Sequence, residues 1–334
     1  MSTYVIAEIG VNHDGVLARA LELVEHARAA GANAVKLQLF RAHTLMHASS
    51  AFATYQAGRV ADATPADMLR RYELSPSDVT TLVEAIRAAG LDPIATPFSP
   101  RDLAQIAELN LPAIKIASPD LVNRPLLQAA AGLRKPLLLS TGAATMAEVA
   151  ATVGWLRDWG AEFTLLHCVS SYPTPDDQAN LCWIAELAGR FSCPVGYSDH
   201  TTDGLAGAFA VAAGATVIEK HLTYDRAASG PDHSASADPA QLVDYVRAVR
   251  RADVLRGQGG KRVLPIEQDV RKVSRQSLVL TRDLAPGELI SESDLTPQRP
   301  GTGIPAADVQ KVTGRSVAMA LRAGTLLDWE MLAA

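Results

Sequence analysis

Polar side chains with catalytic and ligand-binding chemistry stand at the ends of eight short apolar runs in the first two thirds of the chain. Amines, hydroxyls, imidazoles, an amide and a carboxylate are all represented. These residues are Glu8, Lys36, Gln38, Thr96, Lys115, Ser118, Ser140, His167, His200 and His221. Ammonium groups and neutral donors bind phosphate and carboxylate, and imidazoles bind metal ions. The residue types therefore predict an anion-binding and metal-binding site, if the fold brings the run ends together.

The eight apolar runs predict a fold that would do this. They cover residues 4–10, 34–40, 92–98, 113–118, 136–141, 163–169, 194–200 and 216–222. Alanine-rich segments of helical period separate them, so strand and helix alternate eight times. That is the count of an α/β fold, the (β/α)8 TIM barrel, in which the active site lies where the strands end.

Helix starts are marked by local capping chemistry. Ser75, Ser99 and Asp238 each precede a proline, which predicts a side-chain N-cap followed by proline at the first helical position. Thr145 and Glu148 have the spacing of a capping box.

The composition of the chain changes after about residue 257. A glycine-rich and charged segment leads into short β-type runs separated by Pro-Gly and Ala-Gly turns. We predict a barrel domain over residues 1–260, a linker over 261–277 and a small, mostly β domain over 278–334. Two segments interrupt the barrel pattern. The excursion 41–75, which carries His43, His47, Tyr55 and Gln56, is expected to cover the mouth, and the polar loop 223–238 after the eighth strand is expected to help build the site.

Composition narrows the class of protein. The chain has 334 residues and a net charge of −5, and no basic block stands out, which argues against nucleic acid as a partner. No segment reads as a signal peptide or a membrane span, and three cysteines without metal or redox spacing fit a reducing compartment. A cytoplasmic location without membrane contact is expected.

Lysine is scarce, yet three lysines lie inside predicted strands: Lys36, Lys115 and Lys220. A buried ammonium is costly unless something anionic meets it. We expect all three to face the barrel mouth and to bind an anionic ligand together with the hydroxyls of Thr96, Ser118, Ser140 and Ser198.

His200 and His221 come at the ends of the seventh and eighth predicted strands. Neighbouring strands lie about 4.8 Å apart, so the two imidazoles can share one metal ion and leave positions for water and substrate. The alternative, that each imidazole only makes hydrogen bonds, fits this spacing equally well. Glu8 and Asp120 are carboxylates placed to act as general acid or base, or to pair with a lysine.

Ten motifs, in order, resemble the N-acetylneuraminate (sialic acid) synthase family, which includes legionaminic and pseudaminic acid synthases. They are IAEIGVNHDG, KLQLF, ATPFS, KIAS, LSTG, LHCVSSYPTP, GYSDHT, EKHLTYD, GPDHSAS and RPGTGI. The resemblance runs from about residue 3 to 333 and includes a C-terminal domain similar to the type III antifreeze (SAF) domain. It implies a transferase that condenses phosphoenolpyruvate with the open-chain aldehyde of an N-acylated amino sugar and releases phosphate by C–O cleavage.

The resemblance also implies roles for individual residues. His200 and His221 would hold a divalent ion, most commonly Mn²⁺, and Glu8 and Asp120 would be catalytic. Tyr172, Asp232 and Arg299 would contact the acceptor sugar, with Arg299 supplied by the partner in a domain-swapped homodimer. Phosphoenolpyruvate would be bound by Lys36, Gln38, Thr96, Lys115, Ser118, Ser140, Ser170 and Ser198.

Two residues depart from the family pattern. Asp120 stands where the family usually has glutamate, and Ser170 stands where many members have asparagine. A carboxylate one methylene shorter changes its reach, and small displacements of catalytic groups are costly. Two alternatives therefore stay open: a phosphoenolpyruvate-dependent synthase for another aldose or a phosphorylated sugar, and a barrel that binds sugar or phosphoenolpyruvate without turnover.

Overall fold

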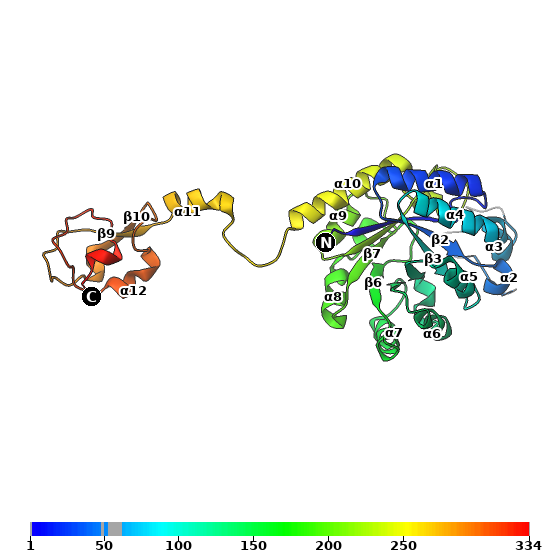
Figure 1. Ribbon diagram of the computed structural model, residues 1–334, viewed down its shortest axis with the longest axis horizontal. Coiled ribbons are helices and arrows are strands. Elements are labelled where there is room, and N and C mark those ends of the chain that lie inside the picture. Colours follow the sequence, from blue (N-terminus) through cyan, green and yellow to red (C-terminus); the bar gives the residue numbers. More distant parts are fainter. Residues whose placement is uncertain (1, 48–49, 53–61, 334) are drawn as a thin grey trace. The chain divides into compact units, whose positions relative to one another are not determined.

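The computed structural model describes residues 2–47, 50–52 and 62–333 and divides into two compact units, Met1–Gly257 and Gln258–Ala334 (Figure 1). Tyr55 and Gln56, in the excursion expected to cover the mouth, lie outside the described residues. No helix within the described ranges has the length and apolar character needed to cross a lipid bilayer.

The first unit is a closed barrel of eight parallel strands, which confirms the predicted fold class. Each strand pairs with the next along the chain, and β8 closes the barrel against β1. The strands are β1 (Tyr4–Gly10), β2 (Ala34–Leu39), β3 (Asp92–Pro97), β4 (Ala113–Ile116), β5 (Leu137–Ser140), β6 (Phe163–Cys168), β7 (Val195–Asp199) and β8 (Val217–His221).

Helices surround the barrel (Figure 1). They are α1 (Leu17–Ala30), α2 (Ala42–Leu45), α3 (Pro65–Tyr72), α4 (Pro76–Ala88), α5 (Asp102–Leu109), α6 (Arg124–Gly132), α7 (Met146–Asp158), α8 (Cys182–Phe191), α9 (Ala206–Ala212) and α10 (Pro239–Arg256). Ser75, Thr145 and Asp238 form capping boxes as predicted. The predicted cap at Ser99 is wrong: α5 begins after Arg101, because Ser99 Oγ donates to the Asp102 carboxylate instead.

The barrel interior is layered along the strands. Its lower layer is an apolar plug formed by Ile6, Ala34, Ile94, Leu138, Leu166 and Val217. Side chains alternate faces along a strand with a period of two. Two residues further along, the same strands therefore point Glu8, Lys36, Thr96, Ser140, Cys168 and Glu219 into the barrel, and all six side chains are buried. A polar layer thus lies directly above the plug.

The same alternation overturns two expectations. His167 and Lys220 occupy the outward-facing positions of β6 and β8, between inward-facing neighbours. His167 Nε2 lies 2.7 Å from the carbonyl oxygen of Ala179. Lys220 Nζ donates to Asp199 Oδ2 at 3.0 Å, and the same carboxylate accepts from Tyr245 of α10. The expectation that these two residues face the mouth is therefore wrong.

The second unit contains a two-stranded antiparallel sheet of β9 (Ser277–Leu280) and β10 (Leu295–Gln298). Isolated bridges, such as Leu284 to Leu321 and Leu289 to Ser316, tie the remaining turns together. The helices of this unit are α11 (Gln268–Ser274), which lies within the predicted linker 261–277, and α12 (Val309–Val312). Its own apolar core is Leu278, Leu280, Leu284, Ile290, Ile304, Val312, Val317, Leu321, Leu327 and Leu332.

Candidate active site

A cavity of about 380 Å³ lies above the polar layer at the carboxyl ends of the strands. We call it the mouth cavity. Most of the residues predicted from the sequence line it together: Lys36, Gln38, Thr96, Lys115, Ser118, Ser140, Ser170, Tyr172, Ser198, His200, His221 and Asp232. Glu8 lies beneath it, with no exposed surface, and contacts two of these lining residues.

Four buried charges form the floor of the mouth cavity. Lys36 Nζ lies 2.9 Å from Glu8 Oε2 and 3.4 Å from Glu219 Oε2. Lys115 Nζ lies 3.7 Å from Glu219 Oε1, which also accepts a hydrogen bond from Ser198 Oγ at 2.9 Å. Two amines and two carboxylates thus balance in a region closed to water, which avoids the cost of an unpaired buried charge.

Burial and pairing shift the pKa values of this floor. Burial lowers the pKa of Lys36 to about 8, against the attraction of Glu219, which raises it. Burial raises the pKa of Glu219, but Lys115 and Lys36 outweigh that effect and lower the pKa to about 2. Glu219 is therefore ionised at neutral pH, and Lys36 loses its charge at a lower pH than an exposed lysine does.

Hydroxyls flank the two lysines. Ser140 Oγ accepts from Lys115 Nζ at 2.6 Å. Thr96 Oγ1 is buried and has no hydrogen-bond partner among the described residues. Ser118 Oγ and Ser170 Oγ pack closely against Gly142, since a Cβ there would lie 2.8 Å and 2.2 Å from them. An orphaned hydroxyl beside buried amines fits a small anion.

The two histidines lie side by side, with ring centroids 5.4 Å apart. His200 Nδ1 lies 2.9 Å from the carbonyl oxygen of Val169, which directs its other nitrogen elsewhere. His221 Nδ1 is buried without a hydrogen-bond partner in the described part of the chain, and Asp232 Oδ2 is 3.9 Å away. Burial lowers the pKa of His221, so its imidazole is neutral at pH 7. A neutral imidazole with an orphaned buried nitrogen fits a metal ligand.

The pair does not extend to a third protein ligand. Within residues 2–47, 50–52 and 62–333, no group of three or more His, Cys, Asp or Glu side chains is placed to hold a metal ion. Two imidazoles are fewer than the three protein ligands usual in catalytic zinc sites, so water and substrate would have to supply the remaining ligands of an ion held here.

The other side of the mouth cavity is different in character. The ring of Tyr172 lies against His200, with centroids 4.0 Å apart, and Asp232 lines the cavity next to it. Beyond them the lining is apolar: Val11, Phe40, Leu45, Met68, Leu69 and Phe98. Several of these pack together as a small apolar cluster of their own, separate from the barrel core.

Two predicted site residues are not brought to the cavity. Asp120 lies in a single turn of 3-10 helix, η1 (Ser118–Val122), and its carboxylate accepts from Asn123 Nδ2 at 2.8 Å. Burial raises the pKa of Asp120, but the side chain does not line the mouth cavity. Arg299 belongs to the second unit, where it follows β10 with an exposed side chain. The roles predicted for both residues stay predictions.

Sequence reasoning missed Glu219 and Cys168, which lie in the polar layer. Glu219 pairs with both lysines, and Cys168 Sγ lies 3.7 Å from His200 Nδ1. A signal was available for each. Glu219 is two residues before His221 and Cys168 is two residues after the buried Leu166, so a strict period of two would have pointed both into the barrel.

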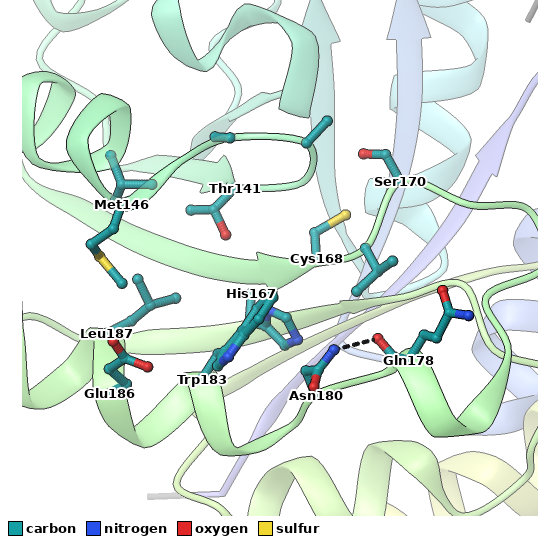
Figure 2. A pocket seen from close by; sticks show the side chains of 14 residues that line it. Thr141, Met146, His167, Cys168, Ser170, Gln178, Asn180, Trp183, Glu186 and Leu187 are labelled. Atoms are coloured by element: carbon teal, nitrogen blue, oxygen red, sulfur yellow. Dashed lines mark hydrogen bonds between the residues drawn. The ribbon is translucent and has the colours of Figure 1, made fainter.

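A second cavity, of about 670 Å³, lies between α7 and α8 and shares Cys168 and Ser170 with the mouth cavity. Figure 2 shows His167 and Trp183 lying against each other in it, with Met146 and Leu187 nearby. It is the larger of the two cavities, yet no lysine or arginine lines it among the described residues. Of these two cavities, the mouth cavity is therefore the one suited to an anion.

Comparison with known proteins agrees with this geometry. Sequence models described as the NeuB family and the SAF domain match residues 23–261 and 275–333. A Legionella pneumophila protein named N,N'-diacetyllegionaminic acid synthase is 38% identical over 340 residues, covering 100% of this chain and 96% of its own. A Campylobacter jejuni protein of that name is 37% identical, covering 94% and 95%. The crystal structure of an N-acetylneuraminic acid synthetase from Leptospira borgpetersenii aligns with a TM-score of 0.74 at 33% identity, covering 81% of this chain and 90% of that one.

Proposed function

The chain belongs to the NeuB family, and from this premise we propose that it is a nonulosonic acid synthase that joins phosphoenolpyruvate to the open-chain aldehyde of an N-acylated amino sugar. The observation that carries the proposal is the mouth cavity, where two buried lysines and a row of hydroxyls adjoin a pair of imidazoles. One half of the cavity is suited to a phosphorylated carboxylic acid, and the other to a neutral sugar.

Phosphoenolpyruvate is assigned to the strand side of the cavity. Lys36 and Lys115 supply the positive charge, and Ser140 already bonds to Lys115. Ser118 and Ser170 line the same part of the cavity and can donate their hydroxyls to anionic oxygens. Gln38, Thr96 and Ser198 line the same side and supply further neutral donors. Such mixtures of ammonium and hydroxyl groups suit phosphate and carboxylate.

His200 and His221 are proposed to hold one divalent ion, with Mn²⁺ the first choice from the family resemblance. When bound, the ion polarises the aldehyde carbonyl of the acceptor as a Lewis acid. The protein's own contribution is to orient both imidazoles and to keep His221 neutral. His200 is fixed by the Val169 carbonyl, and burial holds His221 in its neutral form.

The reaction balances without a redox partner. The C3 carbon of phosphoenolpyruvate forms a bond to the aldehyde carbon, water adds at C2, and the bond from C2 to the phosphate oxygen breaks. Inorganic phosphate leaves and a 2-keto acid results. The water loses two protons in all: one ends on the aldehyde oxygen and the other leaves with the phosphate. Glu8, beside Lys36 at 2.9 Å and Gln38 at 3.2 Å, is the buried carboxylate proposed to carry the proton that ends on the aldehyde oxygen. Asp120 has less support, because Asn123 engages it outside the cavity.

The acceptor is proposed to be uncharged and to carry apolar acyl or deoxy groups. A phosphorylated acceptor needs cations in the loops around the mouth, and the described arginines there are engaged elsewhere. Arg41 donates to the Leu74 carbonyl, Arg71 pairs with Asp62, and Arg226 donates to the Ser234 carbonyl. In their place the cavity presents the apolar side chains of Leu45 and Met68.

The assay that tests the function is phosphate release from phosphoenolpyruvate, with Mn²⁺, across N-acylated hexosamines, plain aldoses and a hexosamine 6-phosphate. We expect release with an uncharged N-acylated sugar, loss of release in His221→Ala, and full release in His26→Ala, a matched change on the surface of α1. Release only with a plain or phosphorylated aldose would reassign the acceptor. No release with any acceptor would favour a binding barrel without turnover.

Arg299 is proposed to complete the site from the partner chain of a domain-swapped homodimer, in the cytoplasm. In such a dimer, Arg299→Ala and His221→Ala each inactivate every site of their own homodimers. Mixing the two inactive variants restores about a quarter of the wild-type rate, because half of the randomly formed dimers are mixed and each has one intact site. Absence of recovery after subunit exchange has been verified would show that Arg299 does not act across the dimer.

A further inference from the structure

A chain of hydrogen bonds ties the loop after β8 to the loop after β1. His233 has no exposed surface, and its two ring nitrogens meet partners on opposite sides. Nε2 lies 3.1 Å from Asp14 Oδ1, and Nδ1 lies 2.7 Å from Thr223 Oγ1. Asp14 comes from the first loop, whereas Thr223 and His233 come from the loop that carries Asp232. Neither the family roles nor the chemistry described above uses Asp14, Thr223 or His233.

The two loops are joined at a second point nearby. Asn12 Nδ2 donates to the carbonyl oxygen of Leu222 and to Ser236 Oγ, both at 2.9 Å. Ser236 Oγ in turn donates to the carbonyl oxygen of Asp232 at 2.7 Å. Asp14 Oδ2 also accepts from Tyr224 OH at 2.8 Å. The first loop is therefore linked to Asp232 through two intermediaries: Asn12 bonds to Ser236, which bonds to the Asp232 carbonyl, and Asp14 lies 3.1 Å from the neighbouring His233.

The Asp14–His233–Thr223 arrangement has the residue types of a hydrolytic triad but cannot act as one. Thr223 has no exposed surface, and its hydroxyl makes a second contact, with the carbonyl oxygen of Asp225 at 3.1 Å. Neither Thr223 nor His233 lines the mouth cavity or the cavity between α7 and α8. A nucleophile needs access to its substrate, so the three residues serve position and not chemistry.

The loop is shaped to close on this histidine. Gly230 lies against the ring, since a Cβ there would be 2.6 Å from His233 Cδ2 and 3.2 Å from Tyr72 OH. Asp14 has a φ of 52°, in the left-handed region that few non-glycine residues adopt. Asp14 is held in that region by three side-chain partners, namely His233, Tyr224 and Arg19, whose guanidinium lies 2.5 Å from Oδ2. Its conformation is thus fixed by its surroundings, as expected of a positioning residue.

We propose that Asp14 and His233 are positioning residues that set Asp232, and through it the acceptor sugar, beside His221. The inference rests on the proposed function, because Asp232 is assigned there to the acceptor. This pair should affect the acceptor only, because phosphoenolpyruvate is assigned to residues that the Asp14 and His233 side chains do not contact. Loss of the Asp14–His233 contact should therefore weaken binding of the acceptor and leave binding of phosphoenolpyruvate unchanged.

The experiment compares Asp14→Ala and His233→Ala with the wild-type enzyme in steady-state kinetics, with each substrate varied in turn. We expect KM for the acceptor to rise about tenfold or more, and KM for phosphoenolpyruvate to stay within about twofold. Asp14→Asn keeps one oxygen, for His233 or for Tyr224 but not for both, and should recover part of the acceptor affinity. Asp14→Ala made in an Asp232→Ala background should have little further effect, because both changes act through one group.

Asp253→Ala is the matched control. It removes the 2.7 and 2.8 Å hydrogen bonds between Asp253 and Thr3, at the opposite end of the barrel. It should lower the melting temperature without changing either KM. Amide hydrogen exchange over residues 223–238 gives a readout that does not need turnover, and it should quicken in Asp14→Ala and His233→Ala but not in Asp253→Ala.

The outcomes separate the two proposals. A wild-type enzyme that releases no phosphate with any acceptor contradicts the proposed function, and the positioning role is then decided by hydrogen exchange alone. If the wild-type enzyme is active, two results overturn the positioning role: variants that lose affinity for both substrates, and variants that keep their affinity for both. Unchanged exchange over 223–238 in folded variants overturns it as well.

Discussion

The two halves of the mouth cavity are built by different parts of the fold. The charged core of the anion half (Lys36, Thr96, Lys115, Ser140 and Ser198) lies on strands whose register fixes each side chain, and only Ser118 and Ser170 of this half follow strand ends. The acceptor half (Phe40, Leu45, Met68, Tyr172 and Asp232) lies on loops and on the short helices α2 and α3. Strands hold geometry tightly, and loops tolerate change. The barrel strands therefore fix the groups that bind phosphoenolpyruvate, whereas the loops and short helices around them determine which acceptor binds.

The largest expected effect comes from breaking the anion half at Lys115. Lys115→Gln removes one of the two cations of the floor and leaves Glu219 with Lys36 alone. We expect kcat/KM for phosphoenolpyruvate to fall about a thousandfold, as for loss of a group that meets developing charge. A fall below about tenfold, measured by phosphate release on folded protein, would move the anion site elsewhere.

Displacing the serines beside the lysines is the next largest change. Gly142→Ala places a Cβ 2.2 Å from Ser170 Oγ and 2.8 Å from Ser118 Oγ, so both hydroxyls must move. We expect KM for phosphoenolpyruvate to rise about a hundredfold, with KM for the acceptor little changed. Gly154→Ala in α7 meets nothing within 4 Å and is the matched control. Equal kinetics for the two variants would mean that these hydroxyls do not bind the anion.

The anion half should also respond to pH through Lys36. Its pKa is lowered to about 8, so it is charged below that pH and neutral above it. The kcat/KM for phosphoenolpyruvate should therefore fall about tenfold per pH unit above pH 8, since this parameter reports groups of the free enzyme. Lys36→Arg keeps its charge throughout this range and should remove the decline. A wild-type profile that stays flat to pH 10 contradicts this assignment.

The acceptor half should be more tolerant. Leu45→Asn puts a polar group into the apolar wall of the cavity. We expect kcat/KM for the acceptor to fall about tenfold, the usual value of a misplaced apolar contact, while KM for phosphoenolpyruvate stays constant. Val254→Asn, on the exposed surface of α10, is the control. A larger loss for phosphoenolpyruvate than for the acceptor would contradict the division into halves.

Asp120 should have the smallest effect. Asp120→Asn keeps a partner for Asn123 outside the cavity, so we expect kcat to change by less than about threefold. A loss of a hundredfold or more would instead restore the catalytic role that the family resemblance implies for this position. The same substrate panel measures both outcomes.

The strands and the location of the site were predictable from the sequence. All eight strands lie within a residue or two of the predicted runs, because apolar runs bounded by glycine and capping residues are strong local signals. Residues at the run ends, such as Lys36, Ser140 and His221, then meet at one cavity, because parallel strands in a barrel end on the same face.

The errors come from what such local reasoning leaves out. His167 and Lys220 were placed at the mouth because their strands end there, although alternation turns both outward. Glu219 was missed for the converse reason. The position of Asp120 depends on how a single turn of 3-10 helix leaves β4, which no period fixes. The apolar wall of the acceptor half arises from an excursion of irregular sequence, and only tertiary structure assembles it.

The bond between Asp14 and His233 joins residues 219 positions apart in the chain. They flank β1 and β8, the first and last strands, along the seam where the barrel closes. Contacts of such long sequence separation form late, because the loop-closure entropy must be overcome first. The acceptor loop can thus reach its working shape only after the final strand of the barrel has been synthesised and has closed the seam. A barrel that has not closed would therefore be unable to bind the acceptor.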